Sequence, residues 1–382
     1  KDIQEIKIGD FVISGRGEKR KVQNIFDYDI NEKVAIVKSK MPTFKKIEST
    51  QDHKVLAVRH QMCPVMKGDK ETICKPTCNR SCKNKLWKNY KLEWIEAKNL
   101  TKNDFLVYPI TPQHHSKTII FDLMKFDKNL KSNNKYVWYE FGSNKLIFKK
   151  IRRFIKLDKS LARLFGFYAA EGWGRTKNEH AVIGFGFHSN ELENIKEVRK
   201  LLKKVFNLES AIKFHKTRNG CQVFGYSKIV PSFFQKLCGE GVLNKHVPQQ
   251  ILETQNEIII QFLTTLFKGD GSHKDSMRVS FDSVSLDLVS QVKMLLARLG
   301  IMSSIKIRKP EHKNWHTSFK LTVSGKQLFY FNNLFKEFQI PIKKQKFYRN
   351  DTFIQGNYIY FPVKNVEFKD YKGKVYDFTV EK

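Results

Sequence analysis

An internal repeat constrains the possible folds of this chain more than any other feature of its 382 residues. Residues 187–189 (Phe-His-Ser) match residues 281–283 (Phe-Asp-Ser) at an offset of 94 positions, and residues 164–172 match residues 263–271 at an offset of 99. Self-similarity at a nearly constant period indicates a duplicated structural unit. We therefore expect two copies of a unit of about 95 residues, related by a pseudo-twofold axis.

Apolar residues recur at helical spacing within these copies. The spacing predicts helices at residues 160–172, 191–206, 258–269 and 285–299, with paired strands between them. Each copy would then run helix, hairpin, helix, hairpin. This order predicts an α+β domain, and we expect its functional site on the pseudo-axis.

The charge balance indicates a polyanionic partner. Lysine and arginine number 70 against 38 aspartates and glutamates, so the net charge at pH 7 is +32. Strongly basic chains commonly bind nucleic acid. No apolar run approaches the roughly 20 residues that span a bilayer, and the first residues resemble no secretory signal. We therefore expect an intracellular protein, cytoplasmic or nuclear, that is not secreted and has no membrane partner.

The first helix of each copy carries small residues on one face. Gly166 and Ala170 are four positions apart in the first copy, and Thr265 and Gly269 are four apart in the second. Residues at this spacing lie on the same face of a helix, and small side chains allow two backbones to approach closely. We expect these two helices to pack side by side.

Each of these helices ends in an acid followed by glycine, Glu171 before Gly172 and Asp270 before Gly271. Side-by-side packing would bring both carboxylates together at the negative ends of two helix dipoles, which is unfavourable unless a cation binds there. Mg²⁺ prefers oxygen ligands, and clustered divalent metals stabilise the attacking and leaving oxygens of a phosphodiester. The acids therefore predict a Mg²⁺-dependent nuclease. The alternative is that both are solvated helix caps.

Residues 164–172 and 263–271 resemble the paired LAGLIDADG motifs of homing endonucleases, and the resemblance covers residues 154–350. It implies two αββαββα repeats whose sheets form a saddle over DNA, with Glu171 and Asp270 as ligands of the catalytic metals. It also implies a monomer that cuts both strands of a long double-stranded DNA target and leaves short 3′ overhangs. The first motif departs from the commonest form, because Glu171 stands where aspartate is usual.

The same family places a basic residue from each repeat near the metals, where it polarises water or stabilises the scissile phosphate. Lys245 resembles the lysine that precedes the second motif in intein endonucleases, and its repeat partner would be Lys343 or Lys344. The alternative for each of these lysines is a solvated surface charge.

The two ends of the chain have a different texture, that of short alternating strands separated by Gly, Asp and Asn. Such strands are predicted at residues 6–13, 21–25, 34–37, 91–95, 104–108, 358–363 and 374–380. This distribution predicts an all-β domain that is split around the repeat domain.

Residues 50–53 (Thr-Gln-Asp-His) resemble the TxxH element of the Hint fold, which inteins and Hedgehog autoprocessing domains share. Residues 8–12, 96–104 and 375–380 match other intein stretches. Because these stretches lie on both flanks of the repeats, the chain resembles an intein in which an endonuclease is inserted into a Hint domain.

By this resemblance His53, helped by Thr50, would activate the upstream splice-junction amide, Asp377 would assist acyl transfer, and the exteins of a host protein would be partners. The chain as printed has no nucleophilic Cys or Ser before its first strand and no His-Asn pair at its end. Amide activation without a nucleophile cannot splice, so we do not expect the printed chain to process itself. The alternative for His53 is a hydrogen-bonded turn histidine.

Four of the six cysteines lie within twenty positions: Cys63, Cys74, Cys78 and Cys82. Clustered thiols in an intracellular chain favour a metal over disulfides, and four thiolates suffice for a closed structural Zn²⁺ site. Residues 75–91 are basic and carry Trp87 and Tyr90, so the zinc-binding insertion would contact DNA phosphates. The alternative is a zinc site that only orders a long loop.

The expected organisation is multidomain. Residues 1–110 would form the first part of the Hint β domain, with the cysteine-rich insertion at about 59–91; 111–153 a linker or extension; 154–350 the endonuclease domain, with repeats at about 154–250 and 255–350; and 351–382 the last Hint strands. The expected function is that of an intein-type homing endonuclease. The alternatives are a catalytically inactive, maturase-like DNA- or RNA-binding protein and a chain that is primarily a self-splicing intein.

Overall fold

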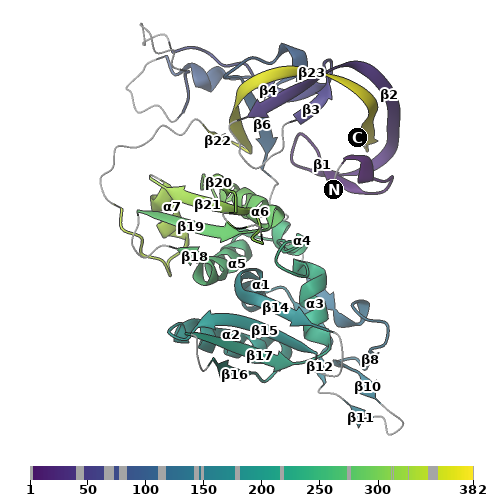
Figure 1. The fold of residues 1–382 in the computed structure, drawn as a ribbon, viewed down its shortest axis with the longest axis vertical. Coiled ribbons are helices and arrows are strands. Elements are labelled where there is room, and N and C mark those ends of the chain that lie inside the picture. The colour runs from purple at the N-terminus through teal and green to yellow at the C-terminus, as the bar shows by residue number, and fades with distance from the viewer. Residues whose placement is uncertain are drawn as a thin grey trace. The chain divides into compact units, whose positions relative to one another are not determined.

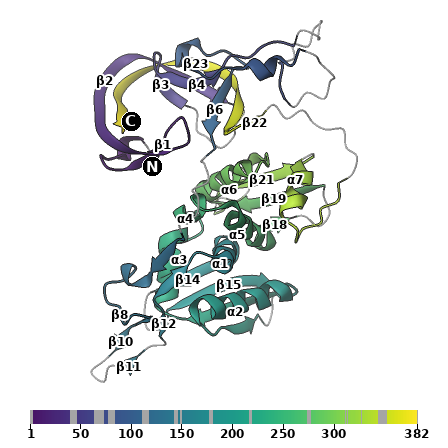
Figure 2. The same ribbon diagram turned by 180° about the vertical axis from the view of Figure 1, so that it is seen from behind.

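The structure is a computed structural model, and the chain in it forms two compact units (Figures 1 and 2). The first combines Lys1–Pro112 with Lys346–Lys382, and the second is Gln113–Gln345. The residues that the structure describes are 3–39, 47–63, 73–76, 84–110, 118–141, 146–147, 150–176, 181–215, 219–272, 277–310, 312, 314–325, 327–342 and 352–381.

The first unit is built on β-strands from both ends of the chain. Its eight-stranded sheet has the order β1-β2-β23-β6-β4-β5, with β3 paired to β2 and β22 paired to β23. The strands are β1 (Phe11–Ile13), β2 (Lys19–Ser39), β3 (Ile47–Thr50), β4 (Lys54–Val58), β5 (Glu93–Glu96), β6 (Phe105–Pro109), β22 (Phe353–Gln355) and β23 (Tyr358–Val380). Short 3₁₀ helices lie at Ile3–Glu5, Leu86–Asn89 and Ala97–Asn99.

Two long strands, β2 and β23, pair along almost their whole lengths, from Val22 opposite Val380 to Ser39 opposite Val363. The expectation of separate short strands at 21–25 and 34–37 was wrong, since both segments belong to β2. The expected strands at 358–363 and 374–380 are likewise parts of β23. The polar residues between these segments lie in a largely exposed stretch, where the antiparallel partner satisfies the backbone hydrogen bonds whatever the side chain.

The second unit begins with small sheets that precede the repeats. β7 (Ile120–Asp122) pairs with β13 (Phe154–Lys156), and β9 (Tyr136–Trp138) pairs with β8 (Lys131–Ser132) and β12 (Ile151–Arg152). β10 (Glu140–Phe141) pairs with β11 (Leu146–Ile147), and a 3₁₀ helix covers Leu123–Lys125. Buried side chains of this segment join the core of the repeats.

Two repeats of the same element order follow, each of αββαββα type. The first consists of α1 (Lys159–Glu171), β14 (Gly172–Arg175), β15 (Val182–His188), α2 (Leu192–Phe206), β16 (Ala211–Phe214), β17 (Gly220–Tyr226) and α3 (Ile229–Cys238). The second consists of α5 (Asn256–Gly269), β18 (Gly271–Ser272), β19 (Arg278–Ser283), α6 (Leu286–Arg298), β20 (Ser304–Arg308), β21 (Ser318–Ser324) and α7 (Gln327–Leu334), and α4 (Gln249–Leu252) lies between the repeats.

Each repeat contains a four-stranded antiparallel sheet, of order β14-β15-β17-β16 in the first and β18-β19-β21-β20 in the second. Helices α2 and α3 pack on the first sheet, and α6 and α7 pack on the second. Side chains that alternate along the strands, such as Phe185 and Val223, face the helices and are fully buried. The opposite face of each sheet is exposed to a greater extent.

The four expected repeat helices are all present, and their ends follow from local capping. Asp158 caps α1 because its carboxylate accepts hydrogen bonds from the backbone N–H groups of Ser160 and Leu161, each at 2.9 Å. The Ser285 hydroxyl caps α6 in the same way by accepting from the N–H of Leu288 at 3.2 Å. These caps fix where the amphipathic segments begin.

Helices α1 and α5 pack directly against each other, which confirms the prediction from their small residues. A β-carbon on Gly166 would lie 2.1 Å from the Thr265 hydroxyl oxygen, and one on Gly269 would lie 2.6 Å from the Ala170 β-carbon. The pseudo-twofold axis therefore passes between these two helices, and their C-terminal ends hold the candidate site. No helix in the described part of the chain is long and apolar enough to cross a membrane.

Candidate active site

The two predicted acids lie beside each other at the ends of the packed helices. Glu171 is the last residue of α1, and Asp270 directly follows α5. A β-carbon on Gly269, the neighbour of Asp270, would lie 3.1 Å from Cγ and 3.7 Å from Oε1 of Glu171. Packing of the small-residue faces therefore brings one carboxylate from each repeat to the pseudo-axis.

Both carboxyl groups are hard to ionise in this position. Burial raises the pKa of Glu171 to about 7, and the charges of Asp270 and Glu191 add to the effect. Burial also raises the pKa of Asp270 to about 7; nearby Lys245 opposes this shift, and Asp282 and Glu191 reinforce it. Carboxylates that repel each other are stabilised by a bound cation. Glu171 is half-buried and Asp270 is exposed to solvent, which leaves solvated helix caps as the alternative.

Lys245 is buried next to these acids. Its ammonium donates hydrogen bonds to the backbone carbonyl oxygens of Tyr168 at 3.0 Å and Ala170 at 3.1 Å, in the last turn of α1. Burial lowers the pKa of Lys245, and the charges of Asp270 and Glu171 oppose this shift. The alternative of a solvated surface charge is therefore wrong for Lys245, which caps the end of α1 and places one positive charge beside the two acids.

A third acid near the site, Glu191, escaped the sequence analysis. It directly precedes α2, and its carboxylate accepts hydrogen bonds from the backbone N–H of His188 at 2.7 Å and from the Asn194 side chain at 3.2 Å. Its charge raises the pKa values of both Glu171 and Asp270. At the repeat offset of 94 positions, Glu191 aligns with Ser285, which caps α6. This alignment was the signal in the sequence that could have pointed to Glu191.

The donor set at the helix ends suits a hard divalent cation. Glu171 and Asp270 supply carboxylate oxygens, the ligands that Mg²⁺ prefers, and Mg²⁺ usually binds through one or two carboxylates while keeping waters or substrate oxygens as its other ligands. Among the described residues, no group of three or more His, Cys, Asp or Glu side chains is arranged to hold a metal ion. The acids therefore offer part of a metal shell that substrate and water would complete.

Several predicted residues fall outside the described part of the chain. They are Lys343 and Lys344, the proposed partners of Lys245, and Cys78 and Cys82 of the cysteine cluster. Cys63 and Cys74 are described, and neither forms a disulfide. They flank an antiparallel bridge between Met62 and Ile73, and the N–H of Cys74 donates to the Gln61 carbonyl at 2.9 Å.

The residues predicted for splicing roles lie at separate points of the first unit. Thr50 ends β3, and the exposed His53 stands in the turn before β4, where its N–H donates to the Thr50 carbonyl at 3.3 Å and its carbonyl accepts from the N–H of Ala97 at 2.9 Å. Asp377 lies on β23 opposite Phe26 of β2. Within the described residues, no hydrogen bond or ion pair joins His53 to Asp377.

The helix-free faces of the two sheets differ in chemistry. In the first repeat, Trp173, Phe224 and Tyr226 are on this face, with the Trp173 ring over Gly184 and the rings of Phe224 and Tyr226 5.5 Å apart. In the second repeat the corresponding face carries cationic side chains. These include Arg278, Lys306, Arg308 and Lys320, of which Arg308 and Lys320 pair with Asp282.

Sequence comparison agrees with this architecture. Residues 158–238 and 257–334 each match the family described as the LAGLIDADG-like domain. The two repeats form a LAGLIDADG-like domain. The first matched range ends at the last residue of α3, and the second ends at the last residue of α7. The match therefore covers both αββαββα repeats and the two acids at their packed helices.

Curated relatives match longer stretches of the chain. An uncharacterized protein of Methanocaldococcus jannaschii, MJ0043, is 27% identical over 100% of this chain and 46% of its own length. A DNA polymerase of Thermococcus litoralis is 30% identical over 59% of this chain and 15% of its own length. An iron-sulfur cluster assembly SufBD family protein of Mycobacterium bovis is 22% identical over 81% and 32%. The chain thus spans less than half the length of each of these relatives.

Solved structures similar to the chain include the homing endonuclease I-DmoI in complex with DNA and Mn, which is 16% identical over 48% of this chain and 99% of that chain, with a TM-score of 0.38. The N-terminal LAGLIDADG domain of DUF199/WhiA is 14% identical over 47% of this chain and 83% of that chain, with a TM-score of 0.33.

Proposed function

We propose that the chain is a site-specific DNA endonuclease that hydrolyses phosphodiester bonds with Mg²⁺ at the junction of its two LAGLIDADG-like repeats. The observation that carries the proposal is the close approach of one carboxylate from each repeat, Glu171 and Asp270, beside the buried Lys245 on the pseudo-axis. Nothing in the packing of α1 and α5 requires two acids at this place, and their mutual repulsion lowers stability without a cation.

In this proposal each residue has a stated task. Glu171 and Asp270 hold the divalent cation, whose charge would stabilise the attacking and leaving oxygens of the phosphodiester. Lys245 is held by the carbonyl oxygens of Tyr168 and Ala170, and its ammonium offsets the negative charge of the acids and attracts the scissile phosphate. Because one acid comes from each repeat, the two halves of the domain would each face one half of the DNA target.

Duplex DNA is the proposed partner because charge and surface both favour it. The net charge of +32 provides the electrostatic attraction to phosphates. The helix-free face of the second sheet supplies arginine and lysine side chains suited to hydrogen bonding with base edges. The aromatic face of the first sheet supplies apolar surface for contacts such as those with thymine methyl groups.

An intein-type setting is favoured by where the relatives occur. Segments of the chain match parts of a DNA polymerase, a DNA helicase and a SufBD family protein, which are proteins of different functions. A sequence that recurs inside unrelated proteins is expected of an inserted element. We propose that the β unit is a Hint-like domain, with Thr50, His53 and Asp377 in the splicing roles and the host protein's exteins as partners.

The cysteine cluster is proposed as a structural Zn²⁺ site formed by Cys63, Cys74, Cys78 and Cys82. The bridge between Met62 and Ile73 supports this proposal, because it draws together the segments that carry Cys63 and Cys74. Metal analysis of the protein purified in reducing buffer should give one zinc per chain and less in a Cys78→Ser variant. Absence of zinc in the unaltered protein would dismiss the site.

The endonuclease proposal is tested by incubating the protein with Mg²⁺ and a complex genomic DNA library and sequencing the ends produced. Glu171→Gln and Asp270→Asn serve as matched variants, since each removes one charge and keeps the side chain's shape. We expect recurrent ends at one site with the unaltered protein and none with either variant, while both variants still bind DNA. Cutting by both variants would overturn the assignment. Absence of recurrent ends, together with DNA binding, would favour the inactive, maturase-like alternative.

A further inference from the structure

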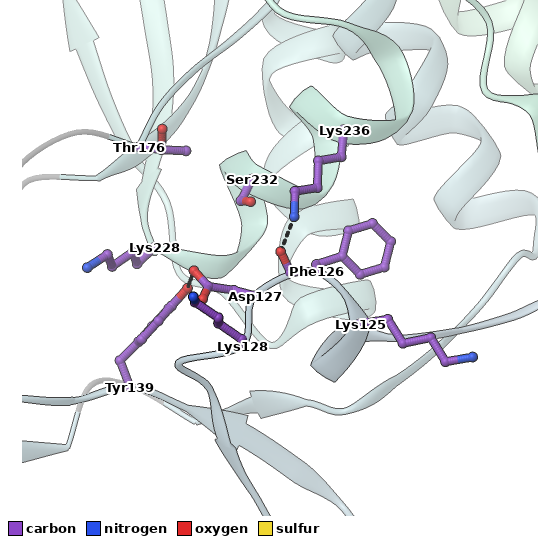
Figure 3. A pocket seen from close by; sticks show the side chains of 9 residues that line it. All are labelled: Lys125, Phe126, Asp127, Lys128, Tyr139, Thr176, Lys228, Ser232 and Lys236. Carbon is purple, nitrogen blue, oxygen red and sulfur yellow. Dashed lines mark hydrogen bonds between the residues drawn. The ribbon is translucent and has the colours of Figure 1, made fainter.

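A cavity of about 440 Å³ lies in the second unit, between residues 118–157 and the first repeat (Figure 3). Four lysines line it, Lys125 and Lys128 from the segment before the repeats and Lys228 and Lys236 from α3 and the residue that precedes it. The hydroxyl groups of Thr176 and Ser232 also line it. Neither Glu171 nor Asp270 contributes to its wall, so the cavity is distinct from the candidate active site.

Specific contacts hold the two sides of this cavity together. The Lys236 ammonium donates to the Phe126 carbonyl oxygen, and the Tyr139 hydroxyl donates to the Asp127 carboxylate (Figure 3). The Lys228 ammonium lies 5.0 Å from the centre of the Tyr139 ring. The contacts of Lys236 and Lys228 join segments about 100 positions apart in the sequence, so the lysines converge because the fold places them there. The bond between Tyr139 and Asp127 orders one side of the cavity.

Positive charge dominates the cavity. Asp127 is its one acid among the residues of the wall. Burial opposes the ionisation of Asp127, but hydrogen bonds from Tyr139 and Asn129 and the charges of Lys236 and Lys228 outweigh burial and lower its pKa. Both carboxylate oxygens accept hydrogen bonds, one from Tyr139 and the other from the N–H of Asn129 at 2.9 Å. Four cations therefore face one carboxylate that is already engaged.

Ammonium and hydroxyl groups that converge on an open cavity suit an anion with several acceptor oxygens. A phosphate group presents such oxygens, and charge-assisted hydrogen bonds from ammonium groups are the strong contacts it makes in proteins. An ammonium has three donors, so Lys236 can keep its bond to Phe126 and still donate to a ligand.

The position of the cavity indicates which phosphate it would meet. Thr176 follows the end of β14, five residues after Glu171, and an extended strand rises about 3.3 Å per residue. Thr176 is therefore at most about 16 Å from the acid along the strand, a distance that a few nucleotides of one DNA strand span. The α3 side of the wall is fixed to β14, since the Gln235 side chain donates to the Gly174 carbonyl at 3.0 Å.

We propose that this cavity binds a backbone phosphate of duplex DNA a few nucleotides from the phosphodiester at the acids. The inference rests on the proposed function for the identity of the polymer. The cavity would extend the DNA contact of the first repeat from the exposed sheet face to the segment before the repeats. This contact would not depend on base sequence, because it is made to the DNA backbone.

Ser232→Asp tests the proposal by placing a carboxylate in the cavity. Ser232 lies in the first turns of α3, where an acid is compatible with the helix dipole, so the variant should fold. Binding to a 40-base-pair duplex of random sequence is measured in metal-free buffer over a range of salt concentrations. Loss of one phosphate contact should lower the log–log salt slope by about 0.9 and weaken binding about eightfold at 100 mM salt.

Two control variants isolate the cavity. Ser232→Asn introduces a side chain of the same shape as aspartate but without its charge. Lys204→Gln, on the exposed part of α2, produces the same change in net charge as Ser232→Asp. Both controls should keep most of the wild-type slope. A Ser232→Asp slope equal to that of Lys204→Gln would overturn the proposal.

Titration with inorganic phosphate separates the DNA backbone from a free phosphate ligand. Phosphate binding that Ser232→Asp abolishes, with DNA binding unchanged, would overturn the DNA assignment in favour of a free ligand. Because binding is measured without metal and without a target sequence, failure of the cleavage proposal leaves this result intact. Conversely, cleavage is tested at Glu171 and Asp270, which lie outside the cavity wall, so failure of the cavity proposal leaves the cleavage test intact.

Discussion

Gly166 of α1 and Thr265 of α5 are in such close contact that a β-carbon on Gly166 would lie 2.1 Å from the Thr265 hydroxyl oxygen and 2.2 Å from the Phe262 carbonyl oxygen. The Thr265 hydroxyl in turn donates to the Arg163 carbonyl of α1 at 2.8 Å. This approach of two helices sets the separation of Glu171 and Asp270, because each acid lies at the end of its helix. The geometry of the site therefore depends on a glycine that carries no chemistry of its own.

Gly166→Ala should destabilise the second unit strongly. The obstructing atoms include a backbone carbonyl, which cannot move aside as a flexible side chain can, and overpacking of a core costs about 1–3 kcal/mol or more. We expect the free energy of unfolding, measured by urea denaturation, to fall by at least about 2 kcal/mol. Gly186→Ala is the matched control, because a β-carbon there meets no atom within 4 Å. Equal stability of the two variants would contradict the close packing.

Mg²⁺ should stabilise the protein through the two acids. Burial and repulsion raise the pKa of each carboxyl to about 7, so the folded state binds their protons more tightly than the unfolded state. Their contribution to stability is therefore greatest at low pH and is lost as pH rises from about 4 to about 7. At pH 8 a cation should restore it, and a ligand at ten times its dissociation constant stabilises by about 1.4 kcal/mol.

The measurement is the thermal midpoint at pH 8 with and without Mg²⁺. We expect a rise of about 3 °C or more in the unaltered protein and a much smaller rise in Asp270→Asn. Without metal, Asp270→Asn should unfold at the same temperature as the unaltered protein or higher, since it removes one of two repelling charges. A Mg²⁺ response that is unchanged in Asp270→Asn would place the cation elsewhere.

Lys245→Met should reduce stability even where catalysis is not measured. The substitution leaves the carbonyl oxygens of Tyr168 and Ala170 without the ammonium that they share, and a buried polar group without its partner costs about 1–3 kcal/mol. Denaturation should show a loss in this range. Lys204→Met, at an exposed position of α2, should cost less than about 0.5 kcal/mol. Similar losses in the two variants would mean that Lys245 does not support the end of α1.

Local signals in the sequence predicted the parts of the fold that depend on short-range patterns. The apolar spacing gave the four repeat helices, and the small residues at Gly166, Ala170, Thr265 and Gly269 predicted which helices meet. The paired acids followed from that packing. These inferences succeed because helix faces and close helix contacts are encoded within a few turns of chain.

Long-range relationships were less accessible to the sequence. The exposed polar middle of β2 was read as a break because its pairing partner, β23, is more than 300 residues away and cannot be seen locally. Glu191 was missed because its place beside the acids results from the packing of α2. The cavity lined by Lys128 and Lys228 likewise depends on a contact between distant segments, which no spacing along the chain reveals.

Glu337 should make stability depend on acid pH. Its carboxylate contacts Arg163 of α1 at 2.7 Å and also pairs with Lys268 of α5. Arg163 and Lys268 both pair with Glu197 as well, so four charges join the two repeats. Burial opposes ionisation of Glu337, but hydrogen bonds from Arg163 and Lys268 outweigh it and lower its pKa to about 2.

A depressed carboxyl pKa contributes stability that is complete above the unfolded-state value and is lost as pH falls through the folded-state value. The difference in unfolding free energy between the unaltered protein and Glu337→Gln should therefore be largest above about pH 4.5 and shrink towards pH 2. Because Glu337 is 41% exposed, solvent screening limits the difference to about 1 kcal/mol. Glu209→Gln, in an exposed pair with Lys203, should change stability less. If the difference in unfolding free energy between the unaltered protein and Glu337→Gln stayed constant from pH 7 to pH 3, the charge network would not stabilise the junction of the repeats.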